Sequence, residues 1–318
     1  MPSPYILGAT LDDVMRSVIE EILSHGVPIK PTKGAAAELT GVLLELADPR
    51  ARLSRTETRG KPFSCLGELC WYLAGTNDVE FISYYIPDYR LYADGDVLFG
   101  GYGPRLLNWR GLNQLDNVTA ILKKRPDSRK AVIQLFDAGD IVEEHNDVPC
   151  TCTLQFMIRE NALQLFVNMR SNDVFLGLPH DIFCFTMLQE IVARALTVEI
   201  GTYKHAVGSL HLYDRNKDAA QQFLDEGWQS TIAMPTMPAG NPWPAIEVLR
   251  SSESAIRTRG RFEEAVLNEV HPYWADLVRL LQVFRYVRDK DVDGIKVQRG
   301  KMSSQVYNLF IDQKLGQL

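Results

Sequence analysis

The sequence has no long hydrophobic run and no excess of positive charge. None of its 318 residues belongs to a stretch of about 18 consecutive apolar residues, so no membrane-spanning helix is expected. Residues 1–5 carry neither the basic start nor the apolar core of a signal peptide. The formal net charge of −6 argues against general nucleic-acid binding, which needs many cationic phosphate contacts. We therefore expect a cytoplasmic protein whose phosphate contacts are confined to one site.

Cysteine is scarce, and linker sequences are lacking. Cys65, Cys70, Cys150, Cys152 and Cys184 form an odd set without paired CxxC spacing. In a reducing compartment this pattern is typical of free thiols and not of disulfides or a zinc site. No tract rich in Ser, Gly and Pro divides the chain, and its 46% hydrophobic content can bury a substantial core. We expect one catalytic domain over residues 1–250, a C-terminal helical extension over 251–318 packed on it, and no metal.

Two helices are predicted early in the chain. Thr10 precedes apolar residues at helical spacing, which predicts a capped amphipathic helix that ends near His25. Ser64 is expected to cap a second helix over residues 65–74. Glu68 lies among the apolar residues of that second helix. A buried carboxylate is either paired, as in an ordinary core, or its pKa rises and it holds a proton, as a proton-relay group does.

Three segments are candidates for ligand contact. Residues 30–34 form a basic turn that either meets a phosphate or is a solvated loop. Residues 99–104 are too rich in glycine for a regular element, so a loop that approaches a ligand closely is expected. Arg129 and Lys130 stand at the entry of a strand predicted over residues 131–136. Two adjacent cations at the entry of a strand can bind a phosphate.

The middle of the chain combines a thiol with a cation. Strands are predicted over residues 151–157 and 163–169, and a strongly apolar helix over 182–196. Cys150 follows a proline at the start of the first strand, an exposed position that suits a nucleophile. Because a thiol attacks as the thiolate, it needs a nearby cation such as Arg170. A structural cysteine is the equal alternative.

Two further elements are predicted near the C-terminal side. A strand over residues 203–213 places His211 and Tyr213 on one face, because side chains alternate along a strand. Two polar aromatic groups suit a sugar hydroxyl, and a half-exposed strand face is the alternative. Residues 273–287 have the apolar spacing of an amphipathic helix.

Taken in order and spacing, several motifs resemble the thymidylate synthase superfamily. They are Pro149-Cys150 with Gln155-Phe156, the run from Arg170-Ser171-Asn172-Asp173 to Leu176-Gly177-Leu178-Pro179, His211-Leu212-Tyr213, Glu68-Leu69-Cys70-Trp71-Tyr72-Leu73 and Asp127-Ser128-Arg129-Lys130. The resemblance implies an α/β fold with three layers around a large twisted mixed sheet. It also implies a homodimer whose sheets pack back to back.

The same resemblance implies a covalent one-carbon transfer. Cys150 would add to C6 of a pyrimidine nucleotide, making C5 nucleophilic toward the methylene carbon of the co-substrate 5,10-methylenetetrahydrofolate. Glu68 would direct proton transfers through water, and Tyr102 would assist removal of the C5 proton. The implied phosphate contacts are Arg170 and Ser171, with Arg129 and Lys130 from the partner subunit; Lys33, or else Lys30, would replace a family arginine. The implied sugar contacts are His211 and Tyr213, and the implied folate contacts are Asp173, Leu176, Gly177 and His180.

Asp181 is a departure from the family pattern, because ordinary thymidylate synthases carry asparagine there. An amide can donate to O4 of uracil and accept from its N3–H. A carboxylate accepts from the N4 amino group of cytosine and can share a proton with N3. The deoxycytidylate hydroxymethylases of phages, which this sequence also resembles, carry the same aspartate. The sequence therefore predicts hydroxymethylation of dCMP or CMP, with a thymidylate synthase acting on dUMP as the alternative.

Other departures from the family pattern bear on the capture of the intermediate by water and on which sugar is bound. Two features of the family pattern are not found in their usual places: the C-terminal tail that closes over the site, and the tryptophan expected after the helix that carries Glu68. Both departures fit capture of the one-carbon intermediate by water. Lys130 replaces a bidentate arginine, so the choice between CMP and dCMP stays open. A catalytically idle relative that binds a nucleotide or RNA, and a purely structural oligomer, are alternatives of another class. The presence of both Cys150 and Glu68 argues against them.

Overall fold

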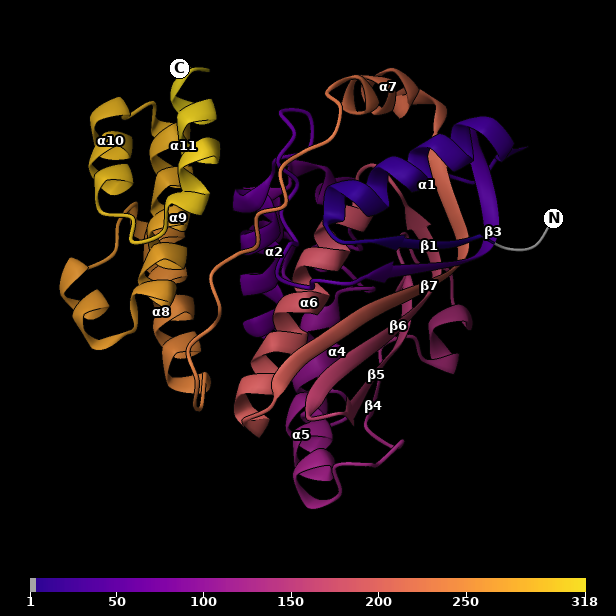
Figure 1. Ribbon diagram of the computed structural model, residues 1–318, viewed down its shortest axis with the longest axis horizontal. Coiled ribbons are helices and arrows are strands. Elements are labelled where there is room, and N and C mark those ends of the chain that lie inside the picture. The colour runs from indigo at the N-terminus through magenta and orange to yellow at the C-terminus, as the bar shows by residue number, and fades with distance from the viewer. Residues whose placement is uncertain (1–3) are drawn as a thin grey trace.

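A computed structural model describes residues 4–318, and a mixed sheet forms its centre (Figure 1). In these residues the sheet has seven strands in the order β1-β3-β7-β6-β5-β4, with β2 paired to β3. The pairs β1·β3 and β6·β7 are parallel, and the others are antiparallel. The strands are β1 (Tyr5–Gly8), β2 (Val27–Ile29), β3 (Ala36–Leu46), β4 (Val132–Gln134), β5 (Thr151–Arg159), β6 (Ala162–Asp173) and β7 (Glu199–Tyr213).

Helices build two layers beside this sheet, which confirms the predicted α/β architecture. Helices α1, α5 and α6 contact strands, α2 packs on α6, and α8 and α9 pack on α2. Figure 1 shows α2 and α6 between the sheet and the C-terminal helices. The helices are α1 (Leu11–His25), α2 (Pro62–Leu73), α3 (Val79–Tyr85), η1 (Pro87–Tyr92), α4 (Tyr102–Leu107), α5 (Gln114–Lys124), η2 (Ala138–Ile141), α6 (Gly177–Leu196), η3 (Asp214–Asn216), α7 (Lys217–Asp225), α8 (Trp243–Arg259), η4 (Glu264–Glu269), α9 (Pro272–Asp289), α10 (Val292–Gly300), η5 (Gln305–Tyr307) and α11 (Asn308–Leu315).

The capping of the first two helices differs. In α1 the Thr10 side chain accepts from the backbone N–H of Asp13, and the Asp13 carboxylate accepts from the backbone N–H of Thr10, so the predicted cap is confirmed. In α2 the predicted Ser64 cap is wrong. The helix begins at Pro62, whose missing N–H is no loss in a first turn. The Ser64 hydroxyl instead donates to the carbonyl of Lys61 at 3.2 Å.

The loop predicted over residues 99–104 is also partly wrong, because α4 begins at Tyr102. Pro104 lies in the first helical turn, where a proline is tolerated. Gly103 allows close packing here, since a Cβ atom on it would lie 2.4 Å from the carbonyl oxygen of Thr76. Tyr102 is therefore placed by a short helix and not by a flexible loop.

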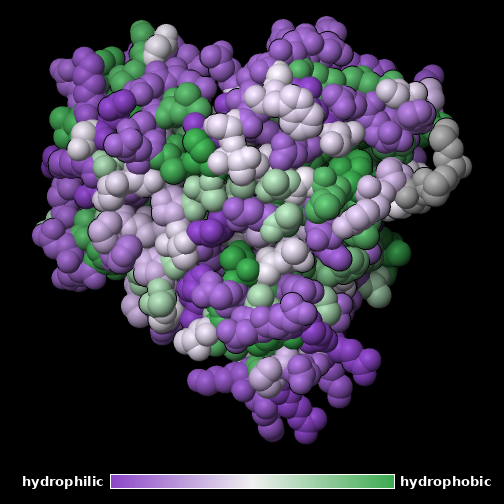
Figure 2. Space-filling model, in the orientation of Figure 1, coloured by the Kyte–Doolittle hydropathy of each residue, from purple (hydrophilic) through white to green (hydrophobic). Residues whose placement is uncertain are grey.

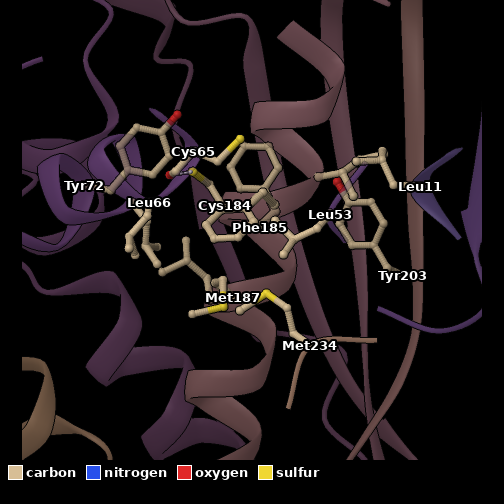
Figure 3. Close-up of a cluster of buried hydrophobic side chains, with 14 of the residues drawn as sticks. Leu11, Leu53, Cys65, Leu66, Tyr72, Cys184, Phe185, Met187, Tyr203 and Met234 are labelled. Atoms are coloured by element: carbon tan, nitrogen blue, oxygen red, sulfur yellow. Dashed lines mark hydrogen bonds between the residues drawn. The ribbon is translucent and has the colours of Figure 1, made fainter. Parts of the chain in front are cut away.

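The core lies between the sheet and helices α2 and α6. Figure 3 shows Cys65 and Leu66 of α2 beside Cys184 and Phe185 of α6. The Cys184 thiol donates weakly to the carbonyl of Cys65 at 3.7 Å. All five cysteines are free, as predicted. This packing fixes α2 against α6, so the polar residues that the two helices carry are fixed as well.

The sheet buries only one of its faces against these helices. On β5 and β6, Leu154 and Leu165 are buried, while their neighbours Gln155 and Phe166 are half-buried on the other face. Leu7 on the edge strand β1 is 58% exposed. In Figure 2, hydrophilic atoms cover α5 at the bottom and most of the C-terminal helices at the left. Within residues 4–318 we find no helix that is long and apolar enough to cross a membrane.

Candidate active site

Glu68 is a buried carboxyl group in the middle of α2. The residue is 3% exposed. Its Oε1 atom accepts hydrogen bonds from the hydroxyls of Tyr72 at 3.1 Å and Tyr89 at 2.6 Å. Its Oε2 atom has no partner among the described residues. Burial raises the pKa of Glu68 to about 7, although the two tyrosines act to lower it. Glu68 can therefore exchange a proton near neutral pH.

Asp181 is a second buried carboxyl group, on the facing helix α6. Its Oδ2 atom accepts a hydrogen bond of 2.7 Å from the side-chain amide of Asn172, at the end of β6. Burial raises the pKa of Asp181 well above its ordinary value, the charge of Glu68 raises it further, and the Asn172 bond lowers it. The raised pKa favours the protonated form of Asp181, which can both donate and accept a hydrogen bond.

Cys150 immediately precedes β5 and faces a fixed arginine. The Nη2 atom of Arg170 lies 3.7 Å from the sulfur. The guanidinium is oriented by the carbonyls of Pro149, at 3.0 Å, and Val148, at 3.1 Å. Burial raises the pKa of Cys150 to about 11, and Arg170 is the main group that lowers it. The resting sulfur is therefore a thiol, and Arg170 is placed to stabilise negative charge that develops on it.

Tyr102 lies near both the Cys150 thiol and Asp181. Its hydroxyl accepts hydrogen bonds from the backbone N–H and the side chain of Thr151, at 3.1 and 2.9 Å. Thr151 adjoins Cys150 in the chain. Burial raises the pKa of Tyr102, and the charges of Asp181 and Cys150 add to this. The structure thus brings Tyr102, Cys150 and Asp181 together, and Glu68 lies near Asp181.

The predicted phosphate contacts are divided between two places. The Lys33 ammonium lies 3.4 Å from Oδ1 of Asp147 and 3.7 Å from the ring centre of Tyr92. Lys33 also lowers the pKa of Cys150, after the effects of burial and of Arg170, so it belongs to this site. Ser171 follows Arg170 on β6 and pairs in register with Ser209.

Arg129 and Lys130 do not reach the thiol in this chain. They lie with Pro126 and Asp127 around a surface hollow between the end of α5 and β4. The carbonyl of Arg129 accepts from the side chain of Gln155, which places the turn at the edge of the sheet. Their expected contact from a second subunit stays a prediction.

The residues expected to bind sugar and folate surround this centre. The rings of His211 and Tyr213 lie on one strand face with centroids 4.9 Å apart and planes at 80°. At the end of β6, Oδ1 of Asp173 accepts from the backbone N–H groups of Phe175, at 2.8 Å, and Leu176, at 3.0 Å. These two bonds shape the turn that leads through Gly177 into α6.

His180 lies on the other side of that turn. Its ring nitrogens contact the carbonyl of Leu176 at 3.1 Å and the hydroxyl of Ser64 at 3.0 Å. Burial lowers the pKa of His180 to about 4, so its ring is neutral at physiological pH. The sequence prediction grouped His180 with Leu176, and the structure places them in contact.

Several contacting residues were missed by the sequence prediction. Tyr72 and Tyr89 both bond Glu68, and Asn172 bonds Asp181. Tyr72 stands four residues after Glu68, a spacing that places two side chains on one helix face, so it was detectable. Tyr89 is far along the chain, and no local pattern connects it to Glu68.

Among residues 4–318, no group of three or more His, Cys, Asp or Glu side chains is arranged to hold a metal ion. The arrangement instead combines a thiol beside a cation, two protonatable carboxyls and a tyrosine. Such a set can add a thiolate to an electron-poor ring and move protons around it.

Comparison with known proteins gives the same type of chemistry. The chain is 32% identical over 221 residues to a deoxyuridylate hydroxymethyltransferase of Bacillus phage SP01, covering 65% of this chain and 58% of that protein. It is 34% identical over 162 residues to a protein of the same name from Pseudomonas phage M6, covering 50% and 46%. A thymidylate synthase of Buchnera aphidicola is 30% identical over 165 residues, covering 49% and 62%. The chain thus spans about half to three fifths of the length of these relatives.

The match to the family itself is broader. The sequence profile described as Thymidylate synthase matches residues 18–243. This range contains each of the residues just described around the thiol, the two carboxyls and the turn after β6. The chain therefore belongs to the thymidylate synthase family, whose members transfer a one-carbon unit to a pyrimidine nucleotide.

Proposed function

We propose that this protein transfers a hydroxymethyl group to C5 of dCMP or CMP, with 5,10-methylenetetrahydrofolate as co-substrate. Residues 1–250 would carry this chemistry, and residues 251–318 would form an extension packed on them. The observation that carries the proposal is the buried Asp181 carboxyl near Cys150, which is held by Asn172 and has a raised pKa. Because of that acid, the pyrimidine ring can be protonated at N3 while its C6 is attacked.

The role of Asp181 follows from the two ring edges. Cytosine has a bare N3, which gains basicity as the Cys150 sulfur bonds to C6. A carboxylic acid can pass its proton to N3 and then accept from the N4 amino group. An asparagine amide cannot give up a proton, and uracil does not need one at N3. An aspartic acid at this position therefore favours cytosine over uracil.

The remaining steps use the other groups of the site. C5 attacks the methylene carbon of the folate, and its proton then leaves with the help of Tyr102. Tetrahydrofolate departs and leaves a methylene group on C5. Water, deprotonated with the help of Glu68, adds to that methylene carbon. Cys150 is expelled as the C5–C6 double bond reforms, giving the hydroxymethyl nucleotide and tetrahydrofolate.

Binding roles follow for the surrounding residues. Arg170, Ser171 and Lys33 would take the 5′-phosphate, and His211 and Tyr213 the sugar. Further proposed contacts are Asp173, Leu176, Gly177 and His180 for the folate.

We also propose a homodimer that pairs the open sheet faces. The half-buried Phe166 and the exposed Leu7 support this, because apolar groups on a free sheet face favour a partner surface. Arg129 and Lys130 of each subunit would complete the phosphate site of the other. Sedimentation should show a dimer, and Phe166→Glu should yield monomers.

Hydroxymethylation of dUMP is the second candidate, because the phage relatives bear that name. Incubation with methylenetetrahydrofolate and each of dCMP, CMP, dUMP and UMP, followed by mass spectrometry, separates the candidates. A gain of one CH2O unit on a cytosine nucleotide is expected. A gain on uracil nucleotides alone would overturn the choice of base. A methyl product with dihydrofolate would identify a thymidylate synthase. Asp181→Asn should move the preference toward uracil.

A further inference from the structure

Asp147 is a half-buried carboxylate that no proposed step of the reaction uses. It lies in the loop before β5, three residues ahead of Cys150. Its Oδ1 atom meets the ammonium of Lys33 at 3.4 Å, and the two side chains are 23% and 38% exposed, so both are open to a ligand. The same ammonium lies over the ring of Tyr92. Asp147 thus holds the lysine that is assigned to the 5′-phosphate.

The backbone of Asp147 is fixed on both sides. Before it, the backbone N–H of Asn146 donates to the carboxylate of Asp94 at 3.2 Å. After it, the next two carbonyls accept from Arg170 at 3.1 and 3.0 Å. Gly100 packs against the side chain, since a Cβ atom there would lie 2.7 Å from Oδ2 of Asp147. The carboxylate therefore has little freedom to move away when another anion arrives.

Charged and titratable groups surround Asp147 from several segments. They are Lys33 in the loop after β2, Arg170 on β6, Asp94 after η1 with its contact His145, and the thiol of Cys150. Burial raises the pKa of Asp147, Lys33 and Arg170 lower it, and the charge of Asp94 raises it. The two cations are the ones assigned to the phosphate. Asp147 therefore already neutralises part of the positive charge that a phosphate needs.

We propose that Asp147 is a built-in competitor of the 5′-phosphate, which binds Lys33 in the free protein and yields that ammonium to the phosphate of the bound nucleotide. The inference rests on the proposed function, because it takes Lys33 and Arg170 as phosphate contacts. A phosphate dianion beside an ionised carboxylate is unfavourable, since like charges repel. Because Asp147 is fixed in place, it loses its negative charge by taking a proton from the solvent as the nucleotide binds. The carboxylate thus weakens nucleotide binding as the pH rises.

Calorimetric titration of the full-length protein with dCMP between about pH 5 and pH 8 tests this exchange. Asp147→Asn keeps the shape of the side chain without its charge, and at the upper pH it should bind dCMP at least about fivefold more tightly than the wild type. The ratio of the two dissociation constants should fall toward one as the pH is lowered, because the wild-type acid is then protonated. The wild type should also take up more protons from the buffer per dCMP bound.

Two further variants provide the control and the test of Lys33. Glu144→Gln removes an exposed charge from the same loop and should leave the dissociation constant for dCMP unchanged. In protein that carries Lys33→Gln, the change Asp147→Asn should tighten dCMP binding less than it does beside the native lysine. An equal gain in both backgrounds would show that Asp147 does not act through Lys33 and would overturn the exchange. Equal affinity of wild type and Asp147→Asn, or weaker binding by the variant, would overturn it as well.

The same titrations distinguish failure of this inference from failure of the proposed function. If dUMP binds in place of dCMP and gives the same pH-dependent ratio, the choice of base is wrong while the role of Asp147 stands. Tight binding of dCMP with no effect of Asp147→Asn would overturn the role of Asp147 alone. Failure to bind any of dCMP, CMP, dUMP and UMP would overturn both.

Discussion

Two pairs of buried acids have opposite surroundings in this fold. Glu68 and Asp181 meet only neutral partners, which are two tyrosine hydroxyls and one asparagine amide. Glu190 pairs with the guanidinium of Arg52 at 2.5 Å and accepts from the backbone N–H of Met237 at 2.9 Å. Asp276, on α9, meets Arg279 at 3.2 Å and accepts from two backbone N–H groups at 2.9 Å.

The difference separates chemistry from scaffold. Neutral donors do not offset the loss of water around a carboxylate, so the pKa values of Glu68 and Asp181 are raised. A guanidinium and backbone N–H groups instead pair with Glu190 and Asp276 and hold their side chains in place. Burial alone therefore does not mark a catalytic acid; the charge of its partners does.

The largest expected effect comes from Cys150, the proposed nucleophile near Glu68 and Asp181. Cys150→Ser should lower the rate of product formation by at least about ten-thousandfold, because the covalent step is lost. Steady-state kinetics with the preferred nucleotide measures this. Cys152→Ser, two residues along, is the matched control and should keep most of the activity.

Substitution of the two kinds of buried acid should change the free energy of unfolding by different amounts. Glu190→Gln breaks a buried ion pair and should destabilise the protein by about 3–5 kcal/mol in urea unfolding. Glu68→Gln replaces an acid whose pKa is raised to about 7 and should leave the stability at neutral pH unchanged or higher, while activity falls about a hundredfold or more. If Glu68→Gln destabilised the protein more than Glu190→Gln, the contrast between the two kinds of buried acid would be contradicted.

Stability should also depend on pH through Glu68. Its pKa is raised to about 7 in the folded protein, whereas an unfolded glutamate ionises near 4.3. Between these values the folded state binds more protons, so stability falls as pH rises, by about 4 kcal/mol in all. Urea unfolding of the wild type and Glu68→Gln across that range measures this slope. The variant should show a flatter dependence, and equal slopes would contradict the raised pKa.

The smallest effect should come from Tyr89. Its hydroxyl bond lowers the pKa of Glu68, so Tyr89→Phe should raise that pKa by about half a unit to one unit. The acidic limb of the pH–rate profile should move upward by the same amount. Tyr84→Phe is the control, since the pKa of Glu68 does not depend on that hydroxyl. A lower maximum rate with an unmoved profile would show that Tyr89 only packs.

Local patterns predicted the parts of the fold that depend on local interactions. The strands predicted over residues 151–157 and 163–169 and the apolar helix predicted over 182–196 are confirmed in β5, β6 and α6. The Ser64 cap failed because Pro62 starts the helix earlier, and the loop at Tyr102 failed because packing against Thr76 favours a helical turn.

The chemistry of the site was predictable by residue type but not by partner. The prediction left open whether Glu68 is paired or protonated, and only the fold brings Tyr89 to it across 21 positions. Such features depend on which distant groups the core brings together.

The central claim is that Asp181 is a protonated acid beside the attacking sulfur. An infrared difference spectrum at neutral pH, in which the spectrum of Asp181→Asn is subtracted from that of the wild type, tests this claim directly. The account predicts a carbonyl band of a protonated carboxyl group that belongs to Asp181 and disappears in the variant. A difference spectrum with only the bands of an ionised carboxylate would contradict it.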